Sequence, residues 1–252
     1  MFRRLYPQAQ ADIVAETYEA FDQTPGRGWR ALAEDAKYQE AATRLEADAV
    51  TVSGQDQPAP LSRPSGVMRV LAISGSLRAA SINSALLRAA ARLAPPEVEI
   101  TLLSGIGELP LFNLDLELQL PPQVAGLRAE VAAADALLIA SPEYAHGVTG
   151  TIKNTLDWLV GFEAFVYKPV AVLNVSPRAH HADSALRETL KTMSAVIVEA
   201  ASVSIPLLGV NLTESGMMES QSVSQAIRAS LAALYRAVVL QQSEQSPTFP
   251  LP

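Results

Sequence analysis

The feature that most constrains the fold is a regular alternation of short apolar runs with amphipathic helical patterns, which begins at residue 68. The apolar runs are short and rich in Val, Ile, Leu and Ala, which is typical of strands buried on both faces of a parallel sheet. The predicted strands cover residues 70–74, 98–103, 136–140, 170–175 and 196–203. The predicted helices cover residues 82–93, 124–133, 151–160, 184–193 and 219–240. Because each crossover has room for a helix, we expect an α/β, doubly wound, five-stranded parallel sheet.

The two ends of the chain do not share this alternation. Residues 8–22 and 28–49 predict two helices, which form a small helical N-terminal appendage over residues 1–52. Residues 53–67 are rich in Pro, Ser, Gly and Gln and predict a flexible linker. The appendage could be a genuine part of the protein, a fused neighbour or a consequence of start-codon choice. The main domain is then expected over 68–240, followed by a disordered tail over 241–252.

Composition excludes several classes of function. The net charge is −7 and the pI about 5.0, whereas nucleic-acid binding usually needs a basic surface. The chain has no cysteine, which excludes disulfides, thiolate catalysis and cysteine-ligated metals. Its three histidines form no His-Glu-x-x-His pattern, and no G-x-S-x-G turn indicates a hydrolase. No apolar run predicts a membrane span or a secretory signal, so we expect a soluble cytoplasmic protein without a metal or nucleic acid.

The stretch SGSLRAASIN, residues 74–83, lies between the first predicted strand and its helix. It matches neither the dinucleotide fingerprint nor the triphosphate-binding loop. It does present Ser76, Arg78, Ser81 and Asn83 at the start of a helix, where hydroxyls, amides and a guanidinium can bind a phosphate monoester. The alternative is structural, with Ser81 capping the helix and Arg78 as a solvated surface charge.

A second polar loop, SPEYAHGVTG, follows the third predicted strand. Pro142 sets a turn, Glu143 and Tyr144 place a carboxylate and a ring at the edge of the sheet, and Gly147 allows close approach of something flat. The alternative for Tyr144 is a half-exposed loop aromatic. In the helix that follows, the i,i+4 spacing of Lys153 and Asp157 is also that of an ordinary surface ion pair. The polar loops follow the strands, so we expect them to meet at one carboxyl edge of the sheet.

Four motifs together resemble a known family. They are G-S-L-R-x-x-S-x-N at 75–83, L-P-x-F-N at 109–113, S-P-E-Y-x-x-G at 141–147 and K-N-x-L-D-W at 153–158. In this order and spacing, residues 68–203 resemble the NADPH-dependent FMN reductase family of flavodoxin-like flavoproteins, which includes quinone, azo-dye and chromate reductases.

The resemblance implies a set of cofactor-binding residues. It implies that Ser76, Arg78, Ser81 and Asn83 hold the FMN phosphate. It also implies that a second group borders the isoalloxazine ring, namely Pro142, Glu143, Tyr144 and Gly147. Ser176 would open a third flavin loop, in which Arg178-Ala179-His180-His181 departs from the glycines common in the family. The two histidines are expected to face solvent as loop residues, although a direct role stays open.

The resemblance further implies an activity and an assembly. A bound FMN would pass electrons from NADPH or NADH to a flavin, quinone or similar small acceptor by a ping-pong mechanism. No catalytic side chain is expected, because the flavin carries the chemistry. The helix that begins near Lys153 and Asn154 would help to build a homodimer or homotetramer interface. The alternative function is an electron shuttle, or a flavin-dependent sensor or partner-binding protein, without independent turnover of NAD(P)H.

Overall fold

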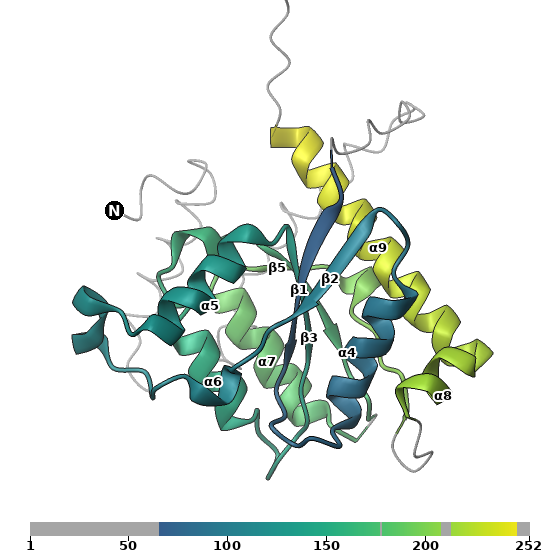
Figure 1. The fold of residues 1–252 in the computed structure, drawn as a ribbon, viewed down its shortest axis with the longest axis horizontal. Helices are drawn as coiled ribbons and strands as arrows, with labels where there is room; N and C mark the ends of the chain where they lie inside the picture. Colours follow the sequence, from purple (N-terminus) through teal and green to yellow (C-terminus); the bar gives the residue numbers. More distant parts are fainter. Residues whose placement is uncertain (1–65, 177, 208–212, 246–252) are drawn as a thin grey trace, which may run out of the picture. The chain divides into compact units, whose positions relative to one another are not determined.

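The computed structural model describes residues 66–176, 178–207 and 213–245. Within these residues a five-stranded sheet has the order β2-β1-β3-β4-β5, and every neighbouring pair of strands is parallel (Figure 1). The prediction of a doubly wound parallel sheet is therefore confirmed. The predictions made for residues 1–65, and for the tail beyond residue 245, lie outside the described residues.

The strands lie close to their predicted positions. They are β1 (Met68–Ser74), β2 (Val98–Leu102), β3 (Ala136–Ala140), β4 (Pro169–Leu173) and β5 (Val196–Ile197). Every residue of β3 and β4 is buried, because helices cover both faces of the sheet at its centre. After β1 the chain crosses to β2 on one side and then to β3 on the other. The order of strands therefore reverses between β1 and β3, which is where open α/β sheets bind ligands.

The helices form a layer on each face of the sheet (Figure 1). One layer contains α4 (Ile82–Leu93), α8 (Glu214–Glu219) and α9 (Gln221–Gln245). The other contains α5 (Pro122–Ala133), α6 (Gly150–Asp157) and α7 (His180–Thr192). The described residues also include short 3-10 helices, which are η2 (Ile106–Glu108), η3 (Leu114–Gln119), η4 (Glu163–Phe165) and η5 (Glu199–Ala201).

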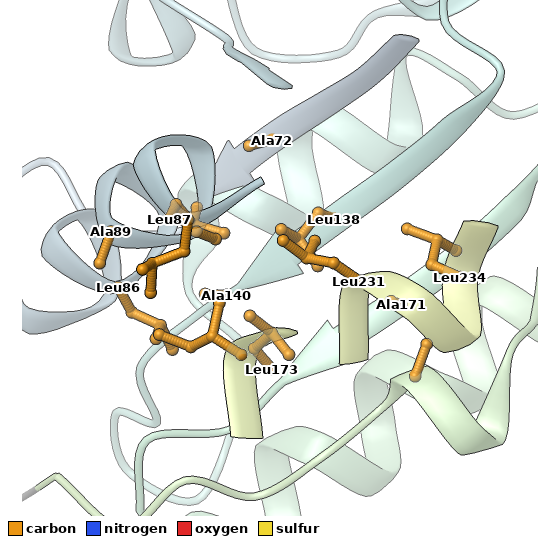
Figure 2. Close-up of a cluster of buried hydrophobic side chains, with 14 of the residues drawn as sticks. Ala72, Leu86, Leu87, Ala89, Leu138, Ala140, Ala171, Leu173, Leu231 and Leu234 are labelled. Atoms are coloured by element: carbon orange, nitrogen blue, oxygen red, sulfur yellow. The ribbon is translucent and has the colours of Figure 1, made fainter. Parts of the chain in front are cut away.

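Alternate residues of each central strand point into opposite layers. In Figure 2, Leu86 and Leu87 of α4 and Leu231 of α9 pack over Leu138 and Ala140 of β3. Burial of one such leucine contributes about 2 kcal/mol, so these contacts hold the helices on the sheet firmly. The sheet and its two layers are a scaffold that fixes where the strand-to-helix loops begin.

The fifth strand is much shorter than the predicted stretch of 196–203, and this part of the prediction is wrong. The polar and small residues Glu199–Ala201 form η5 instead, and Ser202 Oγ then accepts a hydrogen bond from the amide of Val172 at 3.0 Å. Parallel pairing resumes beyond η5 as an isolated bridge between Asn174 and Ser204. The apolar residues on either side of η5 produced a strand pattern, although a 3-10 turn interrupts the pairing.

Two helix boundaries also differ from the prediction. Helix α7 begins at His180 rather than at residue 184, so His180 and His181 lie in the first turn of a helix and not in a loop. The helix predicted over 219–240 is α9, which begins at Gln221 because the extended backbone of Ser220 separates it from the short helix α8. Helix α9 continues to Gln245, past the predicted boundary at residue 240.

Helix α9 is the only helix in the described part of the chain that is long and apolar enough to cross a membrane, over Gln221–Glu244. Its apolar face is buried against the sheet and α4, with Ile227, Leu231 and Leu234 in the core (Figure 2). Length and composition alone are weak evidence for a span, since the core helix of a soluble protein shows the same pattern.

Candidate functional site

The loops after β1 and β3 touch each other at the point where the strand order reverses. The amide of Gly75 donates to the carbonyl oxygen of Ala140 at 2.9 Å, which continues the pairing of the two strands. A Cβ atom on Gly75 would lie 2.1 Å from Ser141 Oγ and 2.6 Å from Ile152 Cγ1. Only glycine therefore fits here, because such distances leave no room for a methyl group. This contact brings the first two predicted cofactor loops together.

The loop after β1 holds its shape through short-range hydrogen bonds. Ser76 N donates to Ser74 Oγ and Arg78 N to Ser76 Oγ, each at 3.4 Å. Ser81 Oγ accepts from the amide of Ser84 at 3.3 Å, which makes Ser81 the N-cap of α4. The capping role weighed for Ser81 in the sequence is thus present, and it leaves the phosphate-binding role as a prediction.

Asn83 is the most unusual polar residue of this loop region. Its exposed fraction is only 3%, and its Oδ1 atom has no hydrogen-bond partner among the described residues. Leaving a buried polar group unpaired costs about 1–3 kcal/mol. Arg78, by contrast, is exposed, and its guanidinium pairs with no carboxylate in the described part of the chain. The start of α4 therefore offers a buried amide oxygen and a cation that have no partner among the described residues.

The loop after β3 contains a tight hairpin. Tyr144 and Gly147 exchange two backbone hydrogen bonds, of 3.2 and 3.0 Å, and the two residues between them, Ala145 and His146, have positive φ angles of 49° and 59°. Such turns usually contain Asn or Gly at these positions, so the backbone here is strained. The exposed fraction of Tyr144 is 60%, which leaves its ring free to contact a ligand.

Glu143 connects this hairpin to the next loop. Its Oε2 atom accepts from the amide of Ala182 in the first turn of α7 at 2.8 Å, and its Oε1 atom lies 3.1 Å from His146 Nδ1. The hydrogen bond from the Ala182 amide, and to a smaller extent the contact with His146, hold the pKa of Glu143 below its usual range. Its ionised carboxylate thus caps α7, which the sequence alone did not reveal.

The loop after β4 is closed by its own side chains. Asn174 Oδ1 accepts from the amide of Ser176 at 2.9 Å, and Ser176 Oγ accepts from the amide of Arg178 at 3.2 Å. Ser176 is buried, so its hydroxyl is used inside the loop. A small hollow separates this loop from the loop after β3; its walls include Ser141, Val148 and Ala179. All three predicted cofactor loops are therefore neighbours at the carboxyl edge of the sheet.

Helix α6 is attached to the segment 109–113 by side chains of its own motif. Asn154 Oδ1 accepts from the amide of Phe112 at 2.8 Å, and Asn154 Nδ2 donates to the carbonyl oxygen of Pro110 at 3.0 Å. Trp158 Nε1 also donates to Pro110, at 2.7 Å, and its ring meets that of Phe112 edge-on at 5.0 Å. The motif at 109–113 and the motif at 153–158 are therefore held together by hydrogen bonds and a ring contact. Lys153 forms the expected surface ion pair with Asp157.

With this geometry in place, comparison with known proteins is informative. The family model of NADPH-dependent FMN reductases matches residues 68–208. The chain belongs to that family. An NAD(P)H-dependent FMN reductase from Pseudomonas aeruginosa is 45% identical over 112 residues, which are 43% of this chain and 60% of the relative. A quinone reductase from Pseudomonas putida is 38% identical over 133 residues, 50% of this chain and 71% of the relative. The chain thus spans well under the full length of these relatives.

A solved structure gives a similar result. The flavoenzyme NAD(P)H:(acceptor) oxidoreductase from Paracoccus denitrificans is 27% identical, with a TM-score of 0.56, and the match covers 68% of this chain and 97% of that one. In the present chain, the described residues contain no group of three His, Asp or Glu side chains that could hold a metal ion.

The residues at the start of α4 fit the phosphate of an FMN. A phosphate bound there would meet the exposed guanidinium of Arg78, the hydroxyl of Ser76 and the helix N-terminus, and it would give the buried amide of Asn83 a partner. The amide can present its NH2 group after rotation by half a turn, because oxygen and nitrogen occupy equivalent positions. The sequence did not identify Gly75 or His146, although a glycine directly after a buried strand is a signal of close approach.

Proposed function

We propose that this chain is a flavin-dependent reductase that carries electrons from NADPH or NADH to a small acceptor such as a flavin or a quinone. The observation that carries the proposal is the cluster at the start of α4, beside the strand reversal, where the buried amide oxygen of Asn83 and the exposed guanidinium of Arg78 have no partner in the part of the chain that the structure describes. Family membership and the names of the relatives support the same activity.

The residues of the site would bind the two ends of the cofactor differently. At one end Ser76, Arg78, Ser81 and Asn83 would hold the FMN phosphate, with charge from the guanidinium and donors from the loop. At the other end Pro142, Glu143, Tyr144 and Gly147 would border the ring, and Ser176 would support the third loop. The hairpin supports this division, since Tyr144 is exposed and the strained turn is held by two backbone hydrogen bonds.

The protein's part in the reaction is to bind and orient the flavin and to leave it accessible to the nucleotide and the acceptor. When bound, FMN accepts hydride and passes electrons on, so no side chain has to act as an acid or a base. The backbone amides of 142–147 would set the polarity along the edge of the ring. The exposed position of this loop would let the nucleotide leave before the acceptor enters, which is the ping-pong order.

Anaerobic spectroscopy tests the activity directly. NADPH and then NADH are added to the FMN-loaded protein, and the absorbance of the oxidised flavin is followed. We expect the flavin band to bleach with at least one nucleotide, and a quinone or free flavin to restore it. A flavin that stays oxidised with both nucleotides would contradict the proposal and favour an electron shuttle or sensor.

The phosphate site has a test of its own. Arg78→Ala should weaken FMN binding by about tenfold to a hundredfold, because a charge-assisted hydrogen bond contributes about 1.5–3 kcal/mol. The free energy of unfolding of the apoprotein should stay the same, since the side chain of Arg78 is exposed. Arg69→Ala, at the opposite end of β1, is the matched control and should leave the affinity unchanged. An unchanged affinity in Arg78→Ala would contradict the assignment.

We further propose that the chain forms a homodimer or homotetramer and acts in the cytoplasm. Large apolar side chains are exposed along the segment that α6 holds and in η3, which follows it, with Leu111 at 83%, Leu114 at 71% and Leu118 fully exposed. Apolar groups gathered in this way are typical of interaction surfaces. Light scattering of the wild type and of Leu114→Glu/Leu118→Glu should show an assembly that the substitutions disrupt. Cell fractionation tests the compartment.

A further inference from the structure

All three histidines of the chain gather at one place, although they come from two separate segments, the hairpin after β3 and the start of α7. The rings of His146 and His181 meet edge-on with their centroids 4.5 Å apart, and the centroids of the His180 and His181 rings are 4.0 Å apart. His146 belongs to the hairpin after β3, whereas the other two lie in the first turn of α7. All three residues are exposed, so this histidine cluster is accessible to a ligand.

The hydrogen bonds of the cluster determine which atoms remain for a ligand. His146 Nδ1 lies 3.1 Å from the Glu143 carboxylate, and His180 Nδ1 lies 3.2 Å from the carbonyl oxygen of Arg178. Because the carbonyl oxygen and the ionised carboxylate can only accept, each Nδ1 must carry the proton. The Nε2 atoms of both rings therefore remain for other partners. An Nε2 that takes up a proton near neutral pH becomes a cationic donor.

The charges around the cluster favour an anion. Glu143 is already bound to the amide of Ala182 and to His146, and Asp183 is paired with Arg187 at 2.7 Å. Arg178 is exposed beside the cluster, and none of the ion pairs in the described residues includes it. A protein with a net charge of −7 thus places three imidazoles and an exposed arginine close together.

The position of the cluster indicates which anion it would receive. It adjoins the hairpin proposed to border the flavin ring and lies in the loops after β3 and β4. The proposed FMN phosphate site is instead in the loop after β1. The remaining phosphate-bearing molecule in the proposed reaction is the pyridine nucleotide, which carries a pyrophosphate and, in NADPH, a 2′-phosphate.

We propose that His146, His180 and His181, together with Arg178, bind a phosphate group of the pyridine nucleotide. This inference rests on the proposed function, because it assigns a binding site for that reaction's electron donor. A phosphate bound there would accept charge-assisted hydrogen bonds from the Arg178 guanidinium and from any imidazole of the cluster in its cationic form.

Direct binding tests the inference without turnover. Calorimetry measures the binding of 2′-AMP and 5′-AMP to the FMN-loaded wild type and to His180→Asn/His181→Asn, between pH 6 and pH 8. In the wild type we expect binding of at least one of these mononucleotides. In the double variant we expect about tenfold weaker binding at pH 6, the equivalent of one charge-assisted hydrogen bond. Lys191→Asn, in the last turn of α7, is the matched control and should bind like the wild type.

Steady-state kinetics then locate the phosphate. A rise in KM for NADPH but not for NADH in the double variant would assign the 2′-phosphate, and equal rises would assign the pyrophosphate. Unchanged binding and KM at every pH would overturn the inference while leaving the reductase activity intact. If neither nucleotide reduces the flavin, the proposed function fails, and the calorimetric result still shows whether the cluster binds phosphate.

Discussion

The loops after β1 and β4 lie at the same edge of the sheet but differ in what they do with their polar groups. In the loop after β4, the side chains of Asn174 and Ser176 bond to the loop's own backbone, and the hydroxyl of Ser176 is buried. In the region after β1, the amide oxygen of Asn83 is buried without a partner and Arg78 points to solvent. The polar groups of the loop after β4 thus bond to one another, whereas the region after β1 leaves polar groups unpaired within the described residues.

This difference indicates that the loop after β4 has a supporting role, whereas the region after β1 is suited to binding a ligand. A loop whose hydrogen bonds are internal keeps its shape whether or not a ligand is present. A region that leaves a buried amide unpaired is less stable alone and gains most when a ligand supplies the missing partner. Both loops carry serines at the ends of buried strands, so residue type alone does not distinguish them. Substitutions in each of the two loops test whether this difference holds.

The largest effect is expected from Gly75→Ala. The new methyl group would overlap Ser141 Oγ and Ile152 Cγ1, so the two neighbouring loops must move apart. We expect the free energy of unfolding to fall by about 3 kcal/mol and FMN binding to be lost. Urea denaturation and flavin titration measure the two effects. Gly126→Ala in α5 is the control; nothing lies within 4 Å of its new methyl group, so stability should rise by about 0.5–1 kcal/mol.

Asn83→Ala is expected to separate binding from stability. The amide oxygen has no partner to lose in the described structure, so the apoprotein should change by less than about 1 kcal/mol, while FMN affinity falls at least tenfold. Asn154→Ala is the converse control, because it removes two hydrogen bonds to the segment 110–112 and should cost about 2 kcal/mol. A large loss of apoprotein stability in Asn83→Ala would show that its amide is already used.

Glu143→Gln should alter the dependence of stability on pH. The folded pKa of Glu143 is lowered from its ordinary value of 4.5, mainly by the Ala182 amide. Its ionised form therefore stabilises the protein above that value, and this contribution is lost as pH falls through the lowered folded pKa. Urea denaturation from pH 7 to pH 3 should show a shallower acid decline in Glu143→Gln.

The smallest effect is expected from Ser176→Ala. It removes one hydrogen bond, from the amide of Arg178, and should cost about 1 kcal/mol of stability. FMN affinity should change by less than about twofold, because the hydroxyl is used within its own loop. A loss of affinity as large as that of Asn83→Ala would remove the distinction between the two loops.

The sheet was predictable from sequence because burial on both faces leaves a strong pattern. The runs at β3 and β4 are apolar at nearly every position, and the structure buries every one of these residues. The end of β5 was not predictable in this way, since η5 and a strand can both be built from small and apolar residues. The start of α7 was missed because its first turn is capped by Glu143, which lies 39 residues before Ala182, whose amide it accepts from.

The candidate site was likewise predictable from the sequence only in part. The loops could be placed at one edge because that follows from parallel strands alone. The unpaired amide of Asn83 and the contact of Gly75 with Ser141 depend on packing between segments far apart in sequence, so no local pattern indicates them. The hydrogen bonds of Asn154 to the segment 110–112 likewise join residues more than 40 positions apart, while the assembly interface predicted for its helix stays a prediction.

The attachment of Trp158 to that segment has an optical consequence. Its buried indole bonds to the carbonyl oxygen of Pro110 and meets the ring of Phe112, whose exposed fraction is 37%. Trp158 is the only tryptophan among the described residues. In a Trp29→Phe variant, which leaves Trp158 as the one tryptophan of the chain, its fluorescence would report on Phe112 and on whatever covers it, so the approach of a second subunit could be followed without an attached dye.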